Sequence, residues 1–492
     1  MIFKNMKKKV IKIASAILAA ASVLAIAGCK SGSDYKYDPA ADFRPEEGEI
    51  FADVPKGQYD GYVFRILNGK NGLPSSKIDA ETISGNVLGD VIYERNRNVE
   101  SRLNVVIEEV RDTPEAVYKT ACQSVLAGDE DLYSAVWNSA SYMASMAANG
   151  YLVSSDYLVE ADYEKPWWND RAMSDLSVDS QTYLLFSDIQ LSYYDAHNLV
   201  GFNMEMIEKI DGAEDPYSLA ETGLWTFDKM MELAQMAAVD ENGDGAMESH
   251  DTFGLALDRT IALPMMFGCD VSMSGKDEYD LPYVTCINNE KFFDVYTLIT
   301  DSLFDRAAGI YNSDLNEADD MSDIDMFLNE RSLFIVLTVG ELNELRKTEF
   351  EFGVVPMPKY SSDQKDYVSY ISGKEVWAMG IPASGRNFLR TGIVLENLAA
   401  ETWREDGVRD TYVNGALEFR YVNDDKSRAN LKIVLESGRF DLCEVYGWGK
   451  LASIVEESAS NASEHLMSTL ASNEDEVRSA MNGYIEDITE FK

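Results

Sequence analysis

Strand-like and helix-like segments alternate in the sequence between residues 62 and 139, and this alternation restricts the fold more than any other feature. The apolar runs GYVFRILN, NVVIEEV and LYSAVWN are typical of strands, and segments with apolar residues at helical spacing separate them. One of these helices is expected to have Pro114 in its first turn and Gly128 past its end. The alternation predicts a mainly parallel sheet whose ligands gather at the carboxyl ends of the strands, here residues 68–71 and 137–139.

A second α/β region is predicted after residue 180. The segment QTYLLFSDIQLSYYDAHNLVGFNMEMI has two extended runs, and DPYSLAETGLWTFDKMMELAQMAAV is typical of a helix capped by Thr226. The segment RSLFIVLTVGELNEL predicts a buried strand, and FEFGVVPMPKY and KEVWAMGIP predict two more extended segments. Roughly 440 residues beyond the N-terminal linker are too many for one ordinary core, so two lobes are expected.

The start of the chain predicts export and a lipid anchor. A lysine-rich head and a short apolar run are typical of a signal peptide, here residues 1–28, and LAIAGC resembles a bacterial lipobox. Cys29 is therefore expected to be diacylated, and two acyl chains anchor a protein stably. An ordinary cleaved signal with a chance cysteine is the alternative. The polar residues 29–57 predict a flexible tether to the extracellular face of the cell membrane, of the Gram-positive type.

Composition excludes several classes of function. The formal net charge is −42, and loss of the five signal-peptide lysines would make it more negative, so nucleic acid is a poor partner. The chain has only three histidines, and they are far apart in the sequence, which argues against a zinc site or a Ser-His-Asp triad. The four cysteines after Cys29 have no regular spacing, so buried free thiols are expected, with a Cys269–Cys286 disulfide as the alternative.

The segment DENGDGAMESHD, residues 240–251, has the spacing of a calcium-binding loop. A glycine stands at position 6, and oxygen ligands are expected from positions 1, 3, 5, 7, 9 and 12, which are Asp240, Asn242, Asp244, Ala246 (through its carbonyl), Glu248 and Asp251. Aspartate at position 12 is shorter than the usual glutamate, and a solvated acidic turn without an ion is the alternative. Because the chain has no second copy, we predict a structural Ca²⁺ site rather than a sensor.

Several motifs occur in an order that is difficult to assemble by chance: the lipobox, SAVWNSASYMASMAANGYLVS, KPWWND, DPYSLAETGLWTFDKM before DENGDGAMESHDTFGL, FGVVPMPKY and WAMGIPASG. Together they resemble the extracellular solute-binding lipoproteins of bacterial ABC importers, in the maltodextrin-binding-like branch (family 1, carbohydrate type). The resemblance implies an α/β fold of the periplasmic-binding-protein-like type II, with two lobes around a ligand cleft. It implies a first lobe of residues 58–188 plus 376–425 and a second of residues 189–375 plus 426–492. Crossover hinges are implied near residues 186–198, 370–381 and 423.

The resemblance also implies a function. The chain would be a monomeric binding protein, not an enzyme, that captures a neutral sugar or oligosaccharide and delivers it to the transmembrane subunits of an ABC permease. A secreted cell-surface glycoside hydrolase is the alternative, because acidic side chains are abundant. Peptides, polyamines and metal complexes stay open as ligands, since the negative charge tolerates cations.

A sugar site needs flat aromatic platforms and hydrogen-bonding groups at their edges. Residues with these properties at predicted strand ends and crossovers are candidates for ligand binding: Asn68, Lys70, Trp137, Asn138, Tyr193, Tyr194 and Trp377, with Trp448 in EVYGWGK as a further aromatic candidate. The resemblance implies Thr338 and Glu341 as well, in a loop of the second lobe that touches ligand in the family. Trp167 and Trp168 are expected to be structural, because adjacent side chains on an extended chain point to opposite faces. Trp225 precedes a helix cap and is expected to pack on that helix.

Overall fold

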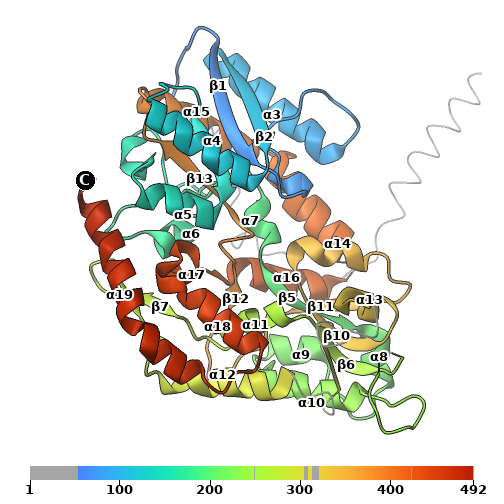
Figure 1. The fold of residues 1–492 in the computed structure, drawn as a ribbon. Coiled ribbons are helices and arrows are strands. Elements are labelled where there is room, and N and C mark those ends of the chain that lie inside the picture. Colours follow the sequence, from blue (N-terminus) through green and yellow to red (C-terminus); the bar gives the residue numbers. More distant parts are fainter. Residues whose placement is uncertain (1–53, 249, 304–308, 313–320, 423, 491–492) are drawn as a thin grey trace, which may run out of the picture. The chain divides into compact units, whose positions relative to one another are not determined.

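The computed structural model describes residues 54–490, except 249, 304–308, 313–320 and 423 (Figure 1). The chain divides into residues 1–46 and a unit of residues 47–492. The predicted signal peptide, Cys29 and most of the predicted tether lie outside the described residues, as does the predicted crossover at residue 423. In the described part of the chain, no helix has both the length and the apolar surface needed to cross a membrane.

The first sheet has five strands in the order β2-β1-β3-β13-β4. β2 and β3 pair in parallel with β1, as the alternating pattern predicts, whereas β13 runs antiparallel to β3. The strands of this sheet therefore come from two distant parts of the sequence: β1 to β4 lie between residues 62 and 153, and β13 begins at residue 377. The bounds are β1 (Tyr62–Gly69), β2 (Val105–Asp112), β3 (Ala135–Ser139), β4 (Leu152–Val153) and β13 (Trp377–Pro382).

Helices cover the first sheet, and local signals set their ends. The Asn86 side chain caps α3, and the Thr113 side chain caps α4, which has Pro114 in its first turn as predicted. Gly128 ends α4 with φ of 69°, a left-handed conformation that glycine adopts without strain. Figure 1 shows α3, α4 and α15 beside this sheet. The bounds are α3 (Val87–Leu103), α4 (Pro114–Ala127), α5 (Ala140–Ala148), α6 (Asp170–Leu176) and α15 (Phe388–Thr402), with short helices η1 (Pro74–Ser76) and η2 (Ser155–Tyr157).

The second sheet also has five strands, in the order β11-β5-β10-β6-β9. β5 runs antiparallel to both of its neighbours, while β10, β6 and β9 are parallel. Every residue of β5, β6 and β11 is buried, and the sequences of β6 and β11 are continuous apolar runs rather than alternating ones, whereas β5 is apolar between Asn198 and Asn203. The bounds are β5 (Asn198–Asn203), β6 (Phe253–Leu257), β9 (Ile310–Asn312), β10 (Ser332–Thr338) and β11 (Phe352–Pro356).

The second sheet has its own helices. Thr226 caps α10, as predicted, by accepting a hydrogen bond from the Lys229 N–H. Trp225, which precedes this cap, is fully buried, and its indole N–H donates to the Pro356 carbonyl at 2.8 Å. The bounds are α8 (Met204–Lys209), α9 (Pro216–Glu221), α10 (Phe227–Ala237), η3 (Arg259–Ile261), α11 (Ala262–Gly268), α12 (Glu290–Leu303), α13 (Asp323–Leu328), η6 (Val339–Glu341), α14 (Leu342–Leu345) and α16 (Asp425–Glu436).

Two segments that carry the chain between the sheets contain α7 and β12. The first leads into β5, and the second leads into β13. A third crossing lies between α15, beside the first sheet, and α16, which packs on β11 of the second. β12 pairs in parallel with the later strand β14. The exact lobe boundaries given above stay a prediction. The remaining elements are α7 (Ser192–Asp195), β7 (Ser274–Lys276), β8 (Pro282–Val284), β12 (Ser369–Tyr370), the π-helix η7 (Asp410–Tyr421), β14 (Gly438–Arg439), α17 (Leu442–Tyr446), η8 (Trp448–Lys450), α18 (Leu451–Ser460) and α19 (Leu466–Glu490).

The adjacent tryptophans Trp167 and Trp168 are buried, as expected, but the stated reason is wrong. Both indole N–H groups donate to the same carboxylate, that of Glu396, at 3.0 Å and 2.8 Å. The two rings point the same way because the chain turns at these residues instead of running extended. Cys269 and Cys286 are buried free thiols, so the disulfide alternative is excluded.

Candidate functional site

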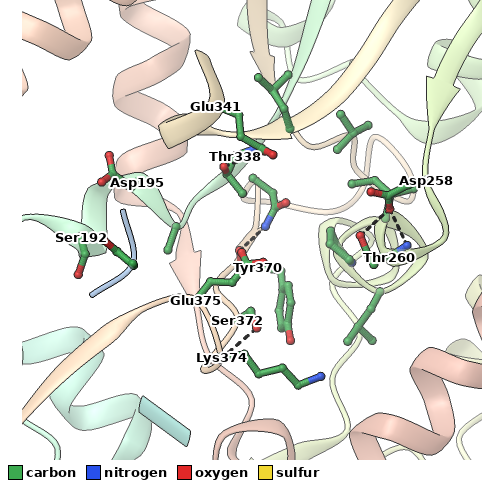
Figure 2. A pocket seen from close by; sticks show the side chains of 18 of the residues that line it. Ser192, Asp195, Asp258, Thr260, Thr338, Glu341, Tyr370, Ser372, Lys374 and Glu375 are labelled. Atoms are coloured by element: carbon green, nitrogen blue, oxygen red, sulfur yellow. Dashed lines mark hydrogen bonds between the residues drawn. The ribbon is translucent and has the colours of Figure 1, made fainter. Parts of the chain in front are cut away.

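A cavity of about 740 Å³ lies between the strand ends of the two sheets. The first sheet contributes residues that follow β1 and β2, together with Trp377 at the start of β13. The second sheet contributes residues at the ends of β6 and β10, and the crossover segments form the floor between them. Figure 2 shows Asp258, Glu341 and Glu375 around the cavity, with Ser192 and Asp195 on α7.

Four of the ten predicted ligand-binding residues line this cavity. Lys70 follows β1, and Trp377 begins the antiparallel strand β13, which β3 separates from β1. Thr338 ends β10, and Glu341 lies in the short helix that follows. The Glu341 carboxylate accepts hydrogen bonds from the Thr338 N–H at 2.7 Å and from its hydroxyl at 2.9 Å, so this capping pair is held as a unit.

The predicted asparagines do not line the cavity. Asn68 is fully buried in β1, where its amide donates to the Ser76 carbonyl at 2.7 Å and to the Glu109 carboxylate at 2.5 Å. Asn138 is also fully buried, and its amide donates to the Pro114 carbonyl at 2.8 Å. Both side chains therefore hold together the loops that present the cavity residues.

The other predicted aromatic residues also lie outside the lining. Trp137 is buried in β3, between β1 and β13. Tyr193 and Tyr194 lie in α7, and the Tyr194 hydroxyl donates to the Asp188 carboxylate at 2.9 Å. Trp448 stacks on Tyr446 with ring centroids 5.2 Å apart. These rings pack against protein, and their contact with ligand stays a prediction.

Several residues that line the cavity were not predicted from the sequence. Asp258 directly follows β6 and could have been found by the strand-end rule that gave Lys70. Asp323 begins α13, and Glu375 lies in the second crossover, so no strand-end pattern marks either of them. Ser192 and Asn198 stand within the predicted first crossover, but they are neither aromatic nor charged and were passed over.

Asp195 joins the two lobes at the base of the cavity. Its buried carboxylate accepts hydrogen bonds from the Ser75 hydroxyl in η1 and from the Tyr412 hydroxyl in η7. Burial raises the pKa of Asp195 to about 6, although these hydrogen bonds oppose the shift. This carboxylate thus ties the first crossover to two separate elements and is not free to receive a ligand with both oxygens.

Acidic side chains dominate the charge of the cavity. Partial burial and the neighbouring Asp258 and Glu341 carboxylates raise the pKa of Asp323 to about 6. The Lys374 ammonium group pairs with the Glu456 carboxylate at 3.1 Å. Ring surface, in contrast, is scarce: Trp377 and Tyr370 are the aromatic residues of the lining, and each is only 5% exposed.

The predicted calcium loop connects α10 to β6, and its side-chain oxygens accept hydrogen bonds from the backbone N–H groups of the same loop. The Asp240 carboxylate accepts hydrogen bonds from the N–H groups of Gly243 at 2.7 Å and Gly245 at 2.8 Å. The side-chain oxygens of Asn242 and Asp244 each accept a hydrogen bond at 2.8 Å from the N–H two residues ahead. These turns shape the first half of the loop.

The second half of the loop is arranged differently from a metal site. The buried Asp251 carboxylate accepts hydrogen bonds from the N–H groups of Glu241 at 3.0 Å and Glu248 at 2.7 Å. Within the described ranges, no three acidic, histidine or cysteine side chains lie close enough together to share an ion. The oxygen-rich donor set suits calcium, but binding requires the Glu248 and Asp251 side chains to turn toward it. Calcium at this loop stays a prediction.

Thermal unfolding tests the calcium prediction. If the native loop binds calcium, then calcium at a hundred times its dissociation constant should stabilise the chain by about 2.7 kcal/mol relative to excess chelator. The melting temperature in millimolar CaCl₂ and in EGTA measures this difference. A variant with both Asp240→Asn and Asp244→Asn should lose the calcium-dependent part, and identical melting curves for the parent chain under both conditions would contradict the prediction.

Solved structures share this architecture, although no family model matches the chain and no curated protein matches it in sequence. An ABC substrate-binding protein from Listeria monocytogenes, in complex with cycloalternan, matches with a TM-score of 0.55 and 13% identity, over 86% of this chain and 100% of its own. The fold is that of a two-lobed substrate-binding protein. A sugar transporter from Rhizobium etli, in an open conformation, gives 0.56 and 11%, over 87% and 99%. An extracellular solute-binding protein from Staphylococcus aureus, in complex with maltose, gives 0.54 and 11%, over 88% and 98%.

The substrate-binding fold confirms the two α/β lobes and the type II architecture that the motifs implied. It also explains why β13 joins the first sheet after the chain has built the second one, because the chain of this fold crosses between lobes more than once. The cavity described above lies between the two lobes of the substrate-binding fold. We refer to it below as the interlobe cleft.

Proposed function

We propose that this chain is the substrate-binding component of an ABC importer and captures a sugar or oligosaccharide in the interlobe cleft. The observation that carries the proposal is the cleft itself, which is lined from both sheets and both crossovers within a substrate-binding fold. Similar folds have been solved with cycloalternan and with maltose, and these neighbours are binding proteins rather than enzymes. The volume of about 740 Å³ is in the range of small-molecule sites.

The polar lining supports a ligand with many hydroxyl groups. Ser192, Asn198, Thr260, Thr338 and Ser372 carry hydroxyl and amide groups on both crossovers and on the second lobe. Each already donates a hydrogen bond within the protein, to Gln190, Tyr370, Asp258, Glu341 and Glu444 respectively, so each chiefly offers a ligand hydroxyl an acceptor oxygen. Because these groups come from different elements, a ligand that bonds to several of them at once stabilises the closed arrangement of the lobes. The ligand thus selects the closed state, which is the state a permease is expected to recognise.

Tryptophan fluorescence tests the proposal. Oligosaccharide binding should close the cleft over Trp377 and change its emission, with an affinity in the micromolar range, about −8 kcal/mol. Maltotriose and oligosaccharides that carry amines are the probes, and calorimetry measures affinity independently of fluorescence. Trp377→Phe should lose most of the fluorescence change while binding continues, because phenylalanine keeps an apolar ring at this position.

A flat calorimetric trace with every oligosaccharide would contradict sugar binding. The hydrolase alternative is tested on the same samples by analysis of the recovered ligand, which we expect to be unchanged. We further propose that the chain acts as a monomer, is held on the extracellular face of the membrane through lipid on Cys29, and delivers its ligand to permease transmembrane subunits. These three proposals derive from the sequence motifs described above.

A further inference from the structure

The charge of the interlobe cleft does not match a neutral guest. Six carboxylate side chains line the cleft against two lysines. One of the six, Asp195, accepts hydrogen bonds from the Ser75 and Tyr412 hydroxyls. Another, Glu456, forms an ion pair with Lys374. The remaining four are Asp258, Asp323, Glu341 and Glu375.

These four carboxylates have no ion-pair partner among the described residues. Asp258 and Glu341 accept hydrogen bonds from the Thr260 and Thr338 groups beside them, which fix their positions without neutralising them. Each comes from a different element: the end of β6, the start of α13, the short helix after β10 and the second crossover. Folding therefore collects, from distant parts of the sequence into one cavity, four carboxylates that form no ion pair with a side chain that the structure describes.

The four charges act on one another. Asp258 and Glu341 contribute to the raised pKa of Asp323, after burial itself. Burial raises the pKa of Glu375, the Glu341, Asp258 and Glu456 carboxylates add to this shift, and the Lys374 ammonium group opposes it. Repulsion among these carboxylates is unfavourable in the free protein, and a bound cation relieves it. The opposing ammonium groups are few, because Lys374 is already paired and Lys70 is exposed at the rim.

The same lining contains groups that suit a sugar. Trp377 is 5% exposed, and its indole N–H has no hydrogen-bond partner within the described part of the chain. A ligand hydroxyl would satisfy that donor. Hydroxyl and amide groups of Ser192, Asn198 and Ser372 stand nearby in the lining, whereas exposed ring surface is scarce. The cleft lining therefore contains groups that can hydrogen-bond to hydroxyls together with carboxylates that favour a positively charged ligand.

Resting on the proposed function, we propose that the oligosaccharide bound in the interlobe cleft carries protonated amines. The Asp258, Asp323, Glu341 and Glu375 carboxylates pair with its ammonium groups, and the hydroxyl and amide groups of the lining bond to its ring hydroxyls. Selection between an amine-bearing chain and a neutral one of the same length is then electrostatic. The net charge of the whole protein adds to the rate of encounter but not to this discrimination.

Calorimetry with four probes tests the proposal on the full mature chain. The probes are a glucosamine trimer, its fully N-acetylated form, maltotriose and spermidine, at pH 6.5 and low salt. The glucosamine trimer should bind at least about tenfold more tightly than either neutral trimer, because acetylation removes the charge and leaves the ring hydroxyls. Its affinity should fall when salt is raised and also when pH is lowered to 5, where Asp323 takes up a proton.

Variants locate the effect in the cleft. The double variant Asp323→Asn, Glu375→Gln should weaken binding of the glucosamine trimer by about tenfold or more, and should lower the ratio of its affinity to that of maltotriose by a similar factor. Glu278→Gln removes one charge from the exposed turn between β7 and β8, outside the cleft, and should change neither affinity. Circular dichroism and melting temperature verify that each variant is folded.

The outcomes separate this inference from the proposed function. Equal or tighter binding of maltotriose would overturn the amine requirement and leave sugar binding intact. Binding of spermidine with no binding of any trimer would overturn both, as would the absence of binding by all four probes. Preference for the glucosamine trimer that survives unchanged in the double variant would overturn the assignment to these carboxylates.

Discussion

Gly254→Ala is expected to lower the free energy of unfolding by about 3 kcal/mol, because β6 has no room for a side chain at this position. A Cβ atom on Gly254 would lie 1.9 Å from the carbonyl oxygen of Ala234 in α10. The obstacle is backbone rather than a flexible side chain, so relief requires α10 to move away from the second sheet. Urea denaturation followed by circular dichroism measures the change.

Gly483→Ala is the matched control for this substitution. A Cβ atom on Gly483, in the interior of α19, would have no heavy atom within 4 Å. Alanine there should stabilise the chain by up to about 1 kcal/mol, since glycine is the poorer helix former. A Gly254→Ala variant as stable as the parent chain would show that α10 does not press on β6 as closely as described.

Arg95→Met should have the second large effect, a loss of about 3 kcal/mol of stability. Arg95 in α3 is 1% exposed, and its guanidinium donates to the carbonyls of Ile78 and Ile189, the latter at 2.8 Å, and to the Thr402 hydroxyl at 3.4 Å. Burial lowers its pKa to about 10, so the group remains charged at neutral pH. Methionine fills the space but leaves the Ile189 carbonyl in the first crossover without this donor.

Arg97→Met separates the buried role from the general effect of losing an arginine. Arg97 lies on the same helix, its side chain is 41% exposed, and it pairs with Glu100 at 2.7 Å. Glu100 is 13% exposed but the Arg97 side chain reaches solvent, and a partly exposed pair of this kind contributes about 1 kcal/mol, so the control should lose much less stability than Arg95→Met. Equal losses in the two variants, measured by urea denaturation, would contradict the role given to Arg95. If Arg95 also holds the crossover in place, its variant should bind ligand more weakly than Arg97→Met does.

Local signals were sufficient to predict most elements near the cleft. The proline in the first turn of α4, the glycine that ends it and the threonine cap of α10 each act over a few residues, so a sequence pattern contains the whole interaction. The alternation of strands and helices predicted the parallel part of the first sheet for the same reason. It could not predict the position of β13, which pairs antiparallel with a strand more than two hundred residues earlier.

The candidate site was predicted only in part. Lys70 follows from the rule that ligands gather at the carboxyl ends of strands, Thr338 was implied by the family resemblance, and the structure places both in the cleft lining. Trp137 obeys the same rule but is buried, because its strand lies between two others and is covered on both faces. Asp323 lies at the start of a helix far from any predicted crossover, and no local pattern distinguishes it from the many other acids of this chain.

The sequence by itself determined the type of most elements near the cleft, the division into two lobes and a large excess of negative charge, because periodicity, caps and composition are properties of neighbouring residues or of the whole chain. Only the tertiary structure decided which carboxylates share the cleft and which are already paired. That distribution depends on contacts between α13, the strand ends and the second crossover, which are separated in sequence and meet only when both sheets have formed. The preference of the cleft for a positively charged ligand therefore depends on the tertiary structure.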